Sequence, residues 1–204
     1  GQFHFIKLMH KVIFSLFVII STSSWGQFSI IPHNVGISYA GETVTHPGGK
    51  LSLMYNLAQW NKVNKSQRGL AKTKRRNTTL NVNFGGFYHQ RYQTGIFFLP
   101  EIEFSESNKK GWYWAAGAGA GYMRTIIPDT YEVQDDGTVE AVNAGHNYGM
   151  ASIYFTYGKD LFIQNKKPWR FFLKPQFVMA FPNFPTLTGY FLLEVGVAYK
   201  LRQF

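Results

Sequence analysis

The sequence predicts an all-β protein, an eight-stranded antiparallel transmembrane β-barrel, and three observations support this prediction. First, residues 186–204 alternate with period two between an apolar face and a face of small and charged side chains, a pattern typical of a strand with lipid on one side and a polar interior on the other. Second, Phe, Tyr and Trp make up 18% of the chain although its mean hydropathy is only −0.16, because apolar and polar positions average out in such strands. Third, no run after residue 26 reaches the ~18 consecutive apolar residues of a transmembrane helix, so a closed sheet is the way left to span a membrane.

The first 26 residues are predicted to be a cleavable signal peptide. Met9 is the expected start, and a basic His10–Lys11 pair precedes the short apolar run VIFSLFVII. Ser24 and Gly26 have the small-residue spacing of a signal-peptidase site, which places cleavage before Gln27. An uncleaved anchor is the alternative. Residues 27–204 then form the outer-membrane barrel domain, and loss of two leader lysines takes the net charge from +10 to +8.

Eight strands are expected between segments with turn chemistry: residues 33–40, 50–60, 78–89, 94–104, 111–123, 148–158, 169–181 and 186–204. Segments 61–76 and 125–147 are expected to be a basic and a long polar connection. With both chain ends in the periplasm, as in bacterial barrels, segments 41–49, 90–93, 125–147 and 182–186 lie outside, and 61–76, 105–110 and 159–168 lie in the periplasm.

Aromatic residues at the strand ends are consistent with this topology. Trp60, Trp112 and Trp169 all fall at the predicted periplasmic interface, and Tyr39, Tyr88 and Tyr122 fall at the outer one. Lipid boundaries favour aromatic girdles at these two levels.

The barrel interior is expected to be filled by a charge network, because eight strands leave an interior just wide enough for side chains. The predicted members are Lys50, Glu101, Glu103, Arg170, Lys174, Glu194 and Lys200. A charge near the middle of the lipid face would cost ~2–4 kcal/mol, so these residues are placed inside, where they can pair.

The fifth predicted strand contains alternating glycine and alanine in AAGAGAGY. Ala116, Ala118 and Ala120 are predicted to face lipid, and Gly117, Gly119 and Gly121 to face the interior. Small interior residues would leave room for long charged side chains opposite. A small-residue stripe on the lipid face could alternatively receive another membrane protein.

Two prolines fall within predicted strands. Pro100 and Pro175 interrupt the fourth and seventh strands, and proline cannot donate to a hydrogen-bond ladder. A bulge that curves the wall is the preferred interpretation, and a weakened seam that admits a lipid tail is the alternative.

The apolar leader, the eight alternating strands and the C-terminal Phe204 resemble the small outer-membrane barrels of the OmpA/OmpX type. The segment GETVTHPGG, residues 41–49, is similar to segments of uncharacterised outer-membrane β-barrel proteins. The resemblance is one of architecture over the whole mature chain. It implies a bacterial outer-membrane location and no particular activity.

The leading functional prediction is a non-enzymatic scaffold or accessory subunit that presents extracellular loops. Its expected partners are outer-membrane lipid, lipopolysaccharide and a further membrane protein, and nucleic acid is excluded for an exported barrel. The alternative is a rim-active enzyme that transfers or removes acyl groups of outer-leaflet lipid with His46, His89 or His146, since a histidine beside a carboxylate and a hydroxyl suits acyl chemistry. No cofactor or metal is expected, because the chain has no cysteine and no histidine pair with ligand spacing.

The connection 61–76 carries the densest basic cluster and no acid: Lys62, Lys65, Arg68, Lys72, Lys74, Arg75 and Arg76. On the predicted topology it meets anionic phospholipid headgroups, each contact contributing ~1 kcal/mol. With the opposite topology it would meet lipopolysaccharide phosphates. A solvated loop is the preferred interpretation.

Overall fold

The structure is a computed structural model that describes residues 31–41, 47–65, 71–89, 93–133, 138–181 and 188–201. These belong to the second of two compact units, Ile31–Phe204, and the predicted signal peptide lies outside the described residues. Among the residues described, none of the helices has the length and apolar character needed to cross a membrane.

Nearly all of the described chain is β-structure. Its elements are β1 (Asn34–Gly41), β2 (Gly48–Lys65), β3 (Ala71–His89), β4 (Gln93–Ser107), β5 (Trp112–Val133), β6 (Val139–Ala144), β7 (Asn147–Asp160), the short helix α2 (Leu161–Asn165), β8 (Trp169–Phe181) and β9 (Thr188–Lys200).

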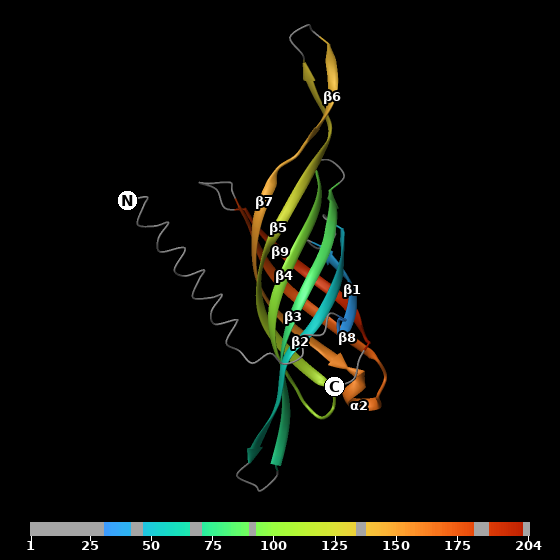
Figure 1. The fold of residues 1–204 in the computed structure, drawn as a ribbon, viewed down its shortest axis with the longest axis vertical. Helices are drawn as coiled ribbons and strands as arrows, with labels where there is room; N and C mark the ends of the chain where they lie inside the picture. The colour runs from blue at the N-terminus through green and yellow to red at the C-terminus, as the bar shows by residue number, and fades with distance from the viewer. Residues whose placement is uncertain are drawn as a thin grey trace, which may run out of the picture. The chain divides into compact units, whose positions relative to one another are not determined.

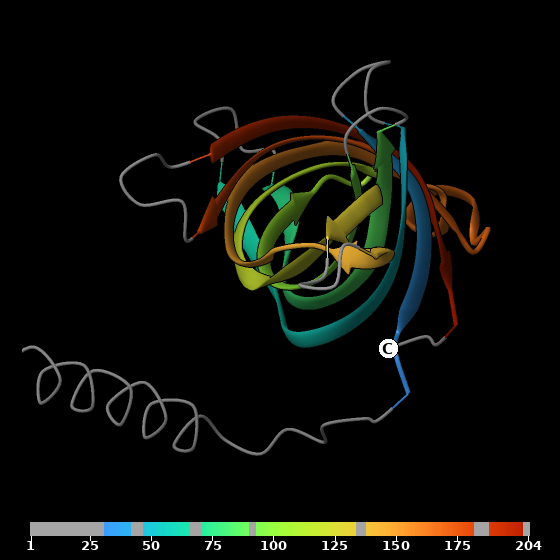
Figure 2. The ribbon, with the colours of Figure 1, turned by 90° about the horizontal axis from the view of Figure 1, so that it is seen from above.

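Eight of these strands form a closed antiparallel ring. Each pairs with its neighbours in the order β1-β2-β3-β4-β5-β7-β8-β9, and β9 pairs back onto β1. Figure 2 shows the ring from above, and Figure 1 shows β6 continuing the β5–β7 side beyond it. The prediction of an all-β fold with eight antiparallel strands is therefore confirmed.

Two segments predicted as connections are largely strand. β2 and β3 stay paired as far as Lys65 and Ala71, so most of 61–76 is a two-stranded ribbon (Figure 1). β5 likewise runs on to Val133 and pairs with β6 inside the expected loop 125–147. The prediction was wrong here because polar composition reports exposure, whereas a hairpin already in register can extend its ladder into solvent with charged side chains on both faces.

The two strand prolines do not produce bulges. Pairing between β4 and β5 lapses at Leu99 and Pro100 and resumes in the same register at Glu101. Pairing between β7 and β8 lapses beside Lys174 and Pro175 and also resumes in register. The preferred bulge interpretation is thus wrong, since each proline removes a donor locally without inserting a residue.

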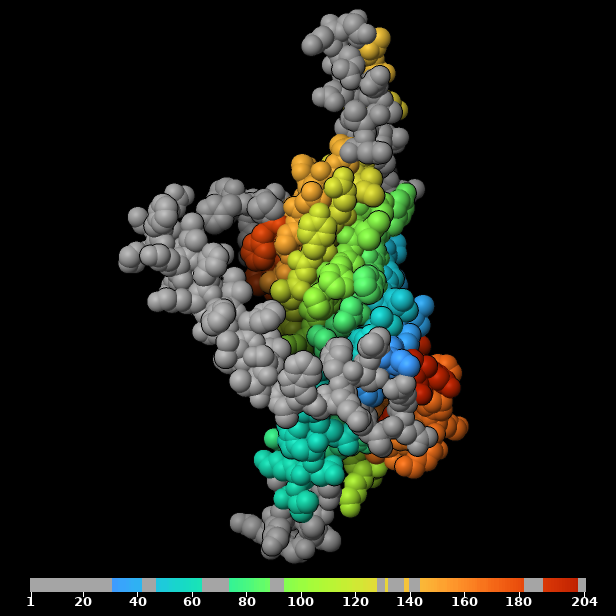
Figure 3. Space-filling view, viewed as in Figure 1, coloured from blue at the N-terminus to red at the C-terminus, as the bar shows by residue number. Residues whose placement is uncertain are grey.

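Side chains alternate between the two faces of the ring. On β7, Ile153, Phe155 and Tyr157 are exposed, while Tyr154 and Thr156 between them are buried. The space-filling view shows these strands as a continuous wall (Figure 3). The period-two pattern in the sequence therefore does separate an outer from an inner face.

The Gly/Ala run of β5 has the orientation that the sequence predicts. Ala116, Ala118 and Ala120 are exposed on the outer face. A Cβ on Gly117 would lie 2.4 Å from the ring of Tyr154, and one on Gly119 would lie 2.6 Å from Cγ of Glu101. The inward glycines thus make room for large side chains that cross the interior.

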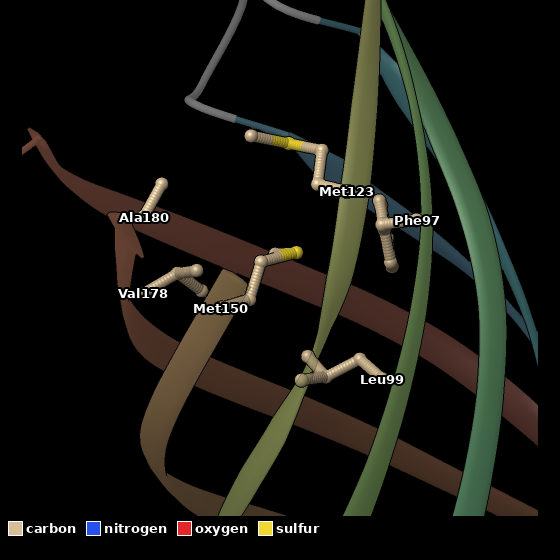
Figure 4. Packing of buried hydrophobic residues seen from close by; sticks show 6 residues of the cluster. All are labelled: Phe97, Leu99, Met123, Met150, Val178 and Ala180. Carbon is tan, nitrogen blue, oxygen red and sulfur yellow. The ribbon is translucent and has the colours of Figure 1, made fainter. Parts of the chain in front are cut away.

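The interior is layered along the ring axis. Towards the end that carries β6 lies an apolar cluster of Phe97, Leu99, Met123, Met150, Val178 and Ala180 (Figure 4). A second apolar cluster contains Met54, Tyr113, Phe172 and Ala198. A layer of charged side chains adjoins this second cluster, because Met54, Tyr113 and Phe172 line the same cavity as Lys50, Lys174 and Glu194.

Candidate functional site

The charged layer is centred on Glu194 of β9. Lys50 Nζ of β2 lies 2.5 Å from Glu194 Oε2, and Ser38 Oγ of β1 donates to Oε1 at 2.7 Å. Lys174 Nζ of β8 lies 3.7 Å from the same carboxylate. Only 1% of Glu194 is exposed, so its charge depends on these partners rather than on water.

Glu101 of β4 is the second anchor of this layer. Lys174 Nζ donates to it at 2.6 Å, Gln176 Nε2 at 2.7 Å and Asn83 Nδ2 at 2.9 Å. Lys174 therefore links carboxylates on β4 and β9, which lie on different sides of the ring. Such an arrangement holds the walls in one relative position.

The structure brings together most, but not all, of the predicted interior charges. Glu103 accepts from Asn81 Nδ2 at 3.5 Å, and Arg170 places its guanidinium carbon 3.9 Å from the centre of the Tyr113 ring. Both line the same cavity as Lys50, Lys174 and Glu194. Lys200 is placed differently, with Nζ 3.7 Å from the centre of the Phe162 ring in α2.

The cavity inside the charged layer has a volume of about 20 Å³, which suffices for about one water molecule. The apolar chamber above it, lined by residues such as Phe97, Met123 and Met150, holds about 30 Å³. Three basic side chains (Lys50, Arg170, Lys174) lie among three buried carboxyl groups (Glu101, Glu103, Glu194). This arrangement is suited to filling and locking the ring rather than to binding an ion or passing a solute.

The histidines proposed for acyl chemistry are only partly described. His46 lies outside the described residues, and so does the side chain of His89 at the end of β3. His146 is exposed, and its ring meets Tyr148 edge-on with centroids 6.2 Å apart. In the part of the chain that the structure describes, His146 is not seen beside a carboxylate.

The tryptophans predicted as a girdle are half-exposed on the outer face. Trp112 stacks on Tyr157 at 5.4 Å, and Trp169 meets Tyr199 edge-on at 5.0 Å. Trp60 lies in a row of cross-strand neighbours with Arg76 and Glu106, and this row continues to Trp114 on β5. Trp114 was not grouped with these tryptophans in the sequence analysis, because it lies two residues inside β5 and not at the end of the strand.

An outer groove lies between Trp60 and Trp114. Its walls also include Phe104, Ser105, Glu106 and Ala116, and its volume is about 280 Å³. Glu106 forms an ion pair with Lys74 and contacts Arg76 at 2.9 Å. Hydrogen bonding from Lys74 holds the pKa of the Glu106 carboxyl below its usual range, so it is ionised at neutral pH.

Sequence reasoning did not assemble this groove, because its residues come from four strands whose register a single sequence does not show. The one available signal was the basic cluster next to Trp60. Comparisons with protein-family models, with curated proteins and with the solved structures find no match for this chain.

Proposed function

We propose that this chain is a transmembrane β-barrel of the bacterial outer membrane that acts as a sealed, non-enzymatic scaffold. The observation that carries this proposal is the inverted polarity of the ring. Ile37, Phe104, Ile153, Phe171 and Phe191, from five different strands, are each exposed by 51–65% on the outer face. The inside contains buried acidic, basic and polar side chains such as Lys50, Glu101 and Asn83.

This polarity suits lipid and not water as the surrounding solvent. Soluble monomers rarely expose a contiguous apolar patch larger than a few hundred Å², whereas here apolar side chains face outward on every strand of the ring. In a bilayer, the same belt meets acyl chains, and the charges avoid the lipid face where each would cost ~2–4 kcal/mol.

The spacing of the aromatic residues supports a membrane-sized belt. Trp112 and Tyr122 lie on the outer face of β5. The strand between them spans roughly 33 Å at ~3.3 Å per residue. At a tilt of ~40° this covers roughly 25 Å, the height of the apolar band of outer-membrane barrels.

The orientation follows from the two ends of the ring. Asn34, the first residue of β1, is paired with Lys200, the last residue of β9. The first strand therefore begins, and the last strand ends, on the same side of the ring. Both ends of bacterial barrels lie in the periplasm, which assigns the β2–β3 ribbon to the periplasm and the β5–β6 hairpin to the cell exterior.

Two features support the scaffold function: the filled interior of the ring and the ribbons that extend from its two ends. The cavities of about 20 and 30 Å³ are too small for a solute path, and the charged layer locks the walls. The ring therefore serves to fix two long ribbons on opposite sides of the membrane, where β5–β6 can present itself to partners. The acyl-chemistry alternative is not favoured by any contact in the described residues.

An epitope inserted in the connection between β5 and β6 tests this orientation. We expect antibody to label intact cells that carry this epitope, and to label cells with an epitope in the β2–β3 connection only after the outer membrane is permeabilised. Equal labelling of both in intact cells would contradict the proposed orientation. A folded protein found in the soluble fraction would contradict the membrane assignment.

A further inference from the structure

The groove beside Trp60 has a polar edge and an apolar floor. Trp60, Arg76, Glu106 and Trp114 are direct cross-strand neighbours on β2, β3, β4 and β5. One step further into the belt, Phe104 lies opposite Ala116. Two indole rings thus flank an ion pair where the apolar face begins.

Cations exceed carboxylates at the polar edge. Lys62 lies directly opposite Lys74 in the β2–β3 ladder, so the two side chains share a face, and such like-charge pairs are destabilising by themselves. Glu106 neutralises one charge of the set Lys62, Lys74 and Arg76. A net charge of +2 therefore remains beside the groove, and a bound anion would relieve the repulsion.

We propose that this groove is a binding site for an anionic glycerophospholipid of the surrounding leaflet, with its phosphate on Lys62, Lys74 and Arg76. The proposal rests on the membrane location proposed above and adds a ligand to it.

The chemistry of such a lipid matches the groove from its charged edge to its apolar floor. Lysine and arginine bind phosphate oxygens by charge-assisted hydrogen bonds. The half-exposed rings of Trp60 and Trp114 sit at the level of the ester groups, where indoles are favoured because one edge is polar and the rest apolar. The first part of an acyl chain then packs on Phe104 and Ala116.

Glu106 is a positioning residue in this site. Its side chain is 8% exposed and joins both Lys74 and Arg76, whose side chains are 37–38% exposed. It holds the two cations over the groove while leaving their outer surfaces accessible. Lys62 is exposed at the outer edge of the same face.

Tryptophan quenching by brominated lipid tests the site. The folded chain is reconstituted in vesicles of phosphatidylcholine that contain a fixed fraction of either phosphatidylglycerol or further phosphatidylcholine, with only that fraction brominated near the headgroup end of its acyl chains. One variant keeps Trp60 as the reporter and a second keeps Trp169, with the other tryptophans of the mature chain replaced by phenylalanine. Trp169 serves as the matched control because it lies in β8, away from the groove.

We expect phosphatidylglycerol to be preferred over phosphatidylcholine at Trp60 by about fivefold or more, since fivefold corresponds to ~1 kcal/mol, the contribution of one cation near an anionic surface. The preference at Trp169 should be smaller. The triple variant Lys62→Gln/Lys74→Gln/Arg76→Gln should bring the preference at Trp60 down to that of Trp169. The charge-matched variant Lys109→Gln/Lys110→Gln/Lys167→Gln, in turns outside the groove, should retain it.

Each other outcome overturns a distinct claim. Equal quenching by the two lipids at Trp60 would contradict the lipid site while leaving the membrane location intact. Loss of preference in both triple variants would show a general charge effect and not a site. Quenching of neither reporter by either brominated lipid would contradict the membrane location itself.

Discussion

Replacing Glu194 with alanine is expected to lower the free energy of unfolding by about 3–5 kcal/mol, the typical cost of removing one partner of a buried ion pair. The variant leaves Lys50, which is 4% exposed, without its partner at 2.5 Å and leaves Lys174 with one carboxylate in place of two. Urea unfolding of the refolded protein, read from the heat-modifiable band on a gel, measures the effect.

Two further variants separate charge balance from general damage. The double variant Lys50→Met/Glu194→Gln removes the cation together with its paired carboxylate, so we expect it to cost clearly less than the sum of the two single variants. Glu106→Ala removes a carboxylate that also holds two cations, but on the outer face with half-exposed partners, and should cost no more than ~1 kcal/mol. A Glu194→Ala protein with unchanged resistance to heat and urea would contradict the locking role of the charged layer.

Replacing Ile153 with arginine is expected to destabilise the protein in lipid vesicles by about 2–4 kcal/mol, because it places a charge on the lipid face near the middle of the belt. Ile153 lies opposite Ala118 on β5 and Phe177 on β8. Its side chain is 58% exposed, so the substitution removes little protein packing. Guanidinium unfolding in vesicles measures the cost.

Gly149→Arg is the matched control for this variant. Gly149 is on the same strand and outer face, close to the end of the belt beside Tyr122. A Cβ there meets Phe181 only at 4.0 Å, so the backbone accepts a side chain. An arginine near the interface costs roughly 0–1 kcal/mol. Equal effects of the two arginines would indicate that the outer face does not meet lipid.

Much of the fold could be predicted from the sequence because the alternation of polarity is local. The alternation of apolar and polar residues around Ile153 or Leu193 is visible from the adjacent residues alone, and it correctly separates the outer from the inner face of the ring. The ribbon β2–β3 could not be predicted in the same way, because consecutive polar residues such as Asn61 and Lys62 are both exposed there and give no alternation.

The site was harder to predict than the fold, because its contacts depend on ring closure. Lys174 donates to Glu101, which lies 73 positions away in the sequence, and a single sequence carries no information on that pairing. Lys200 has the polarity of an interior residue, yet it lies on the Phe162 ring of α2, a helix that the sequence analysis did not predict. The outer groove needs the registers of three strand pairs before Trp60, Arg76 and Trp114 come together.

A spin-label scan along the outer face of β7 tests the central claim, that this face meets lipid, most directly. The chain has no cysteine, so a single cysteine at Gly149, Ala151, Ile153, Phe155 or Tyr157 gives one nitroxide per variant. In reconstituted vesicles, we expect the ratio of collisions with oxygen to collisions with a water-soluble nickel complex to peak at Ile153 and to fall towards both ends. A uniformly low ratio, with nickel reaching Ile153 as readily as Gly149, would contradict the transmembrane account.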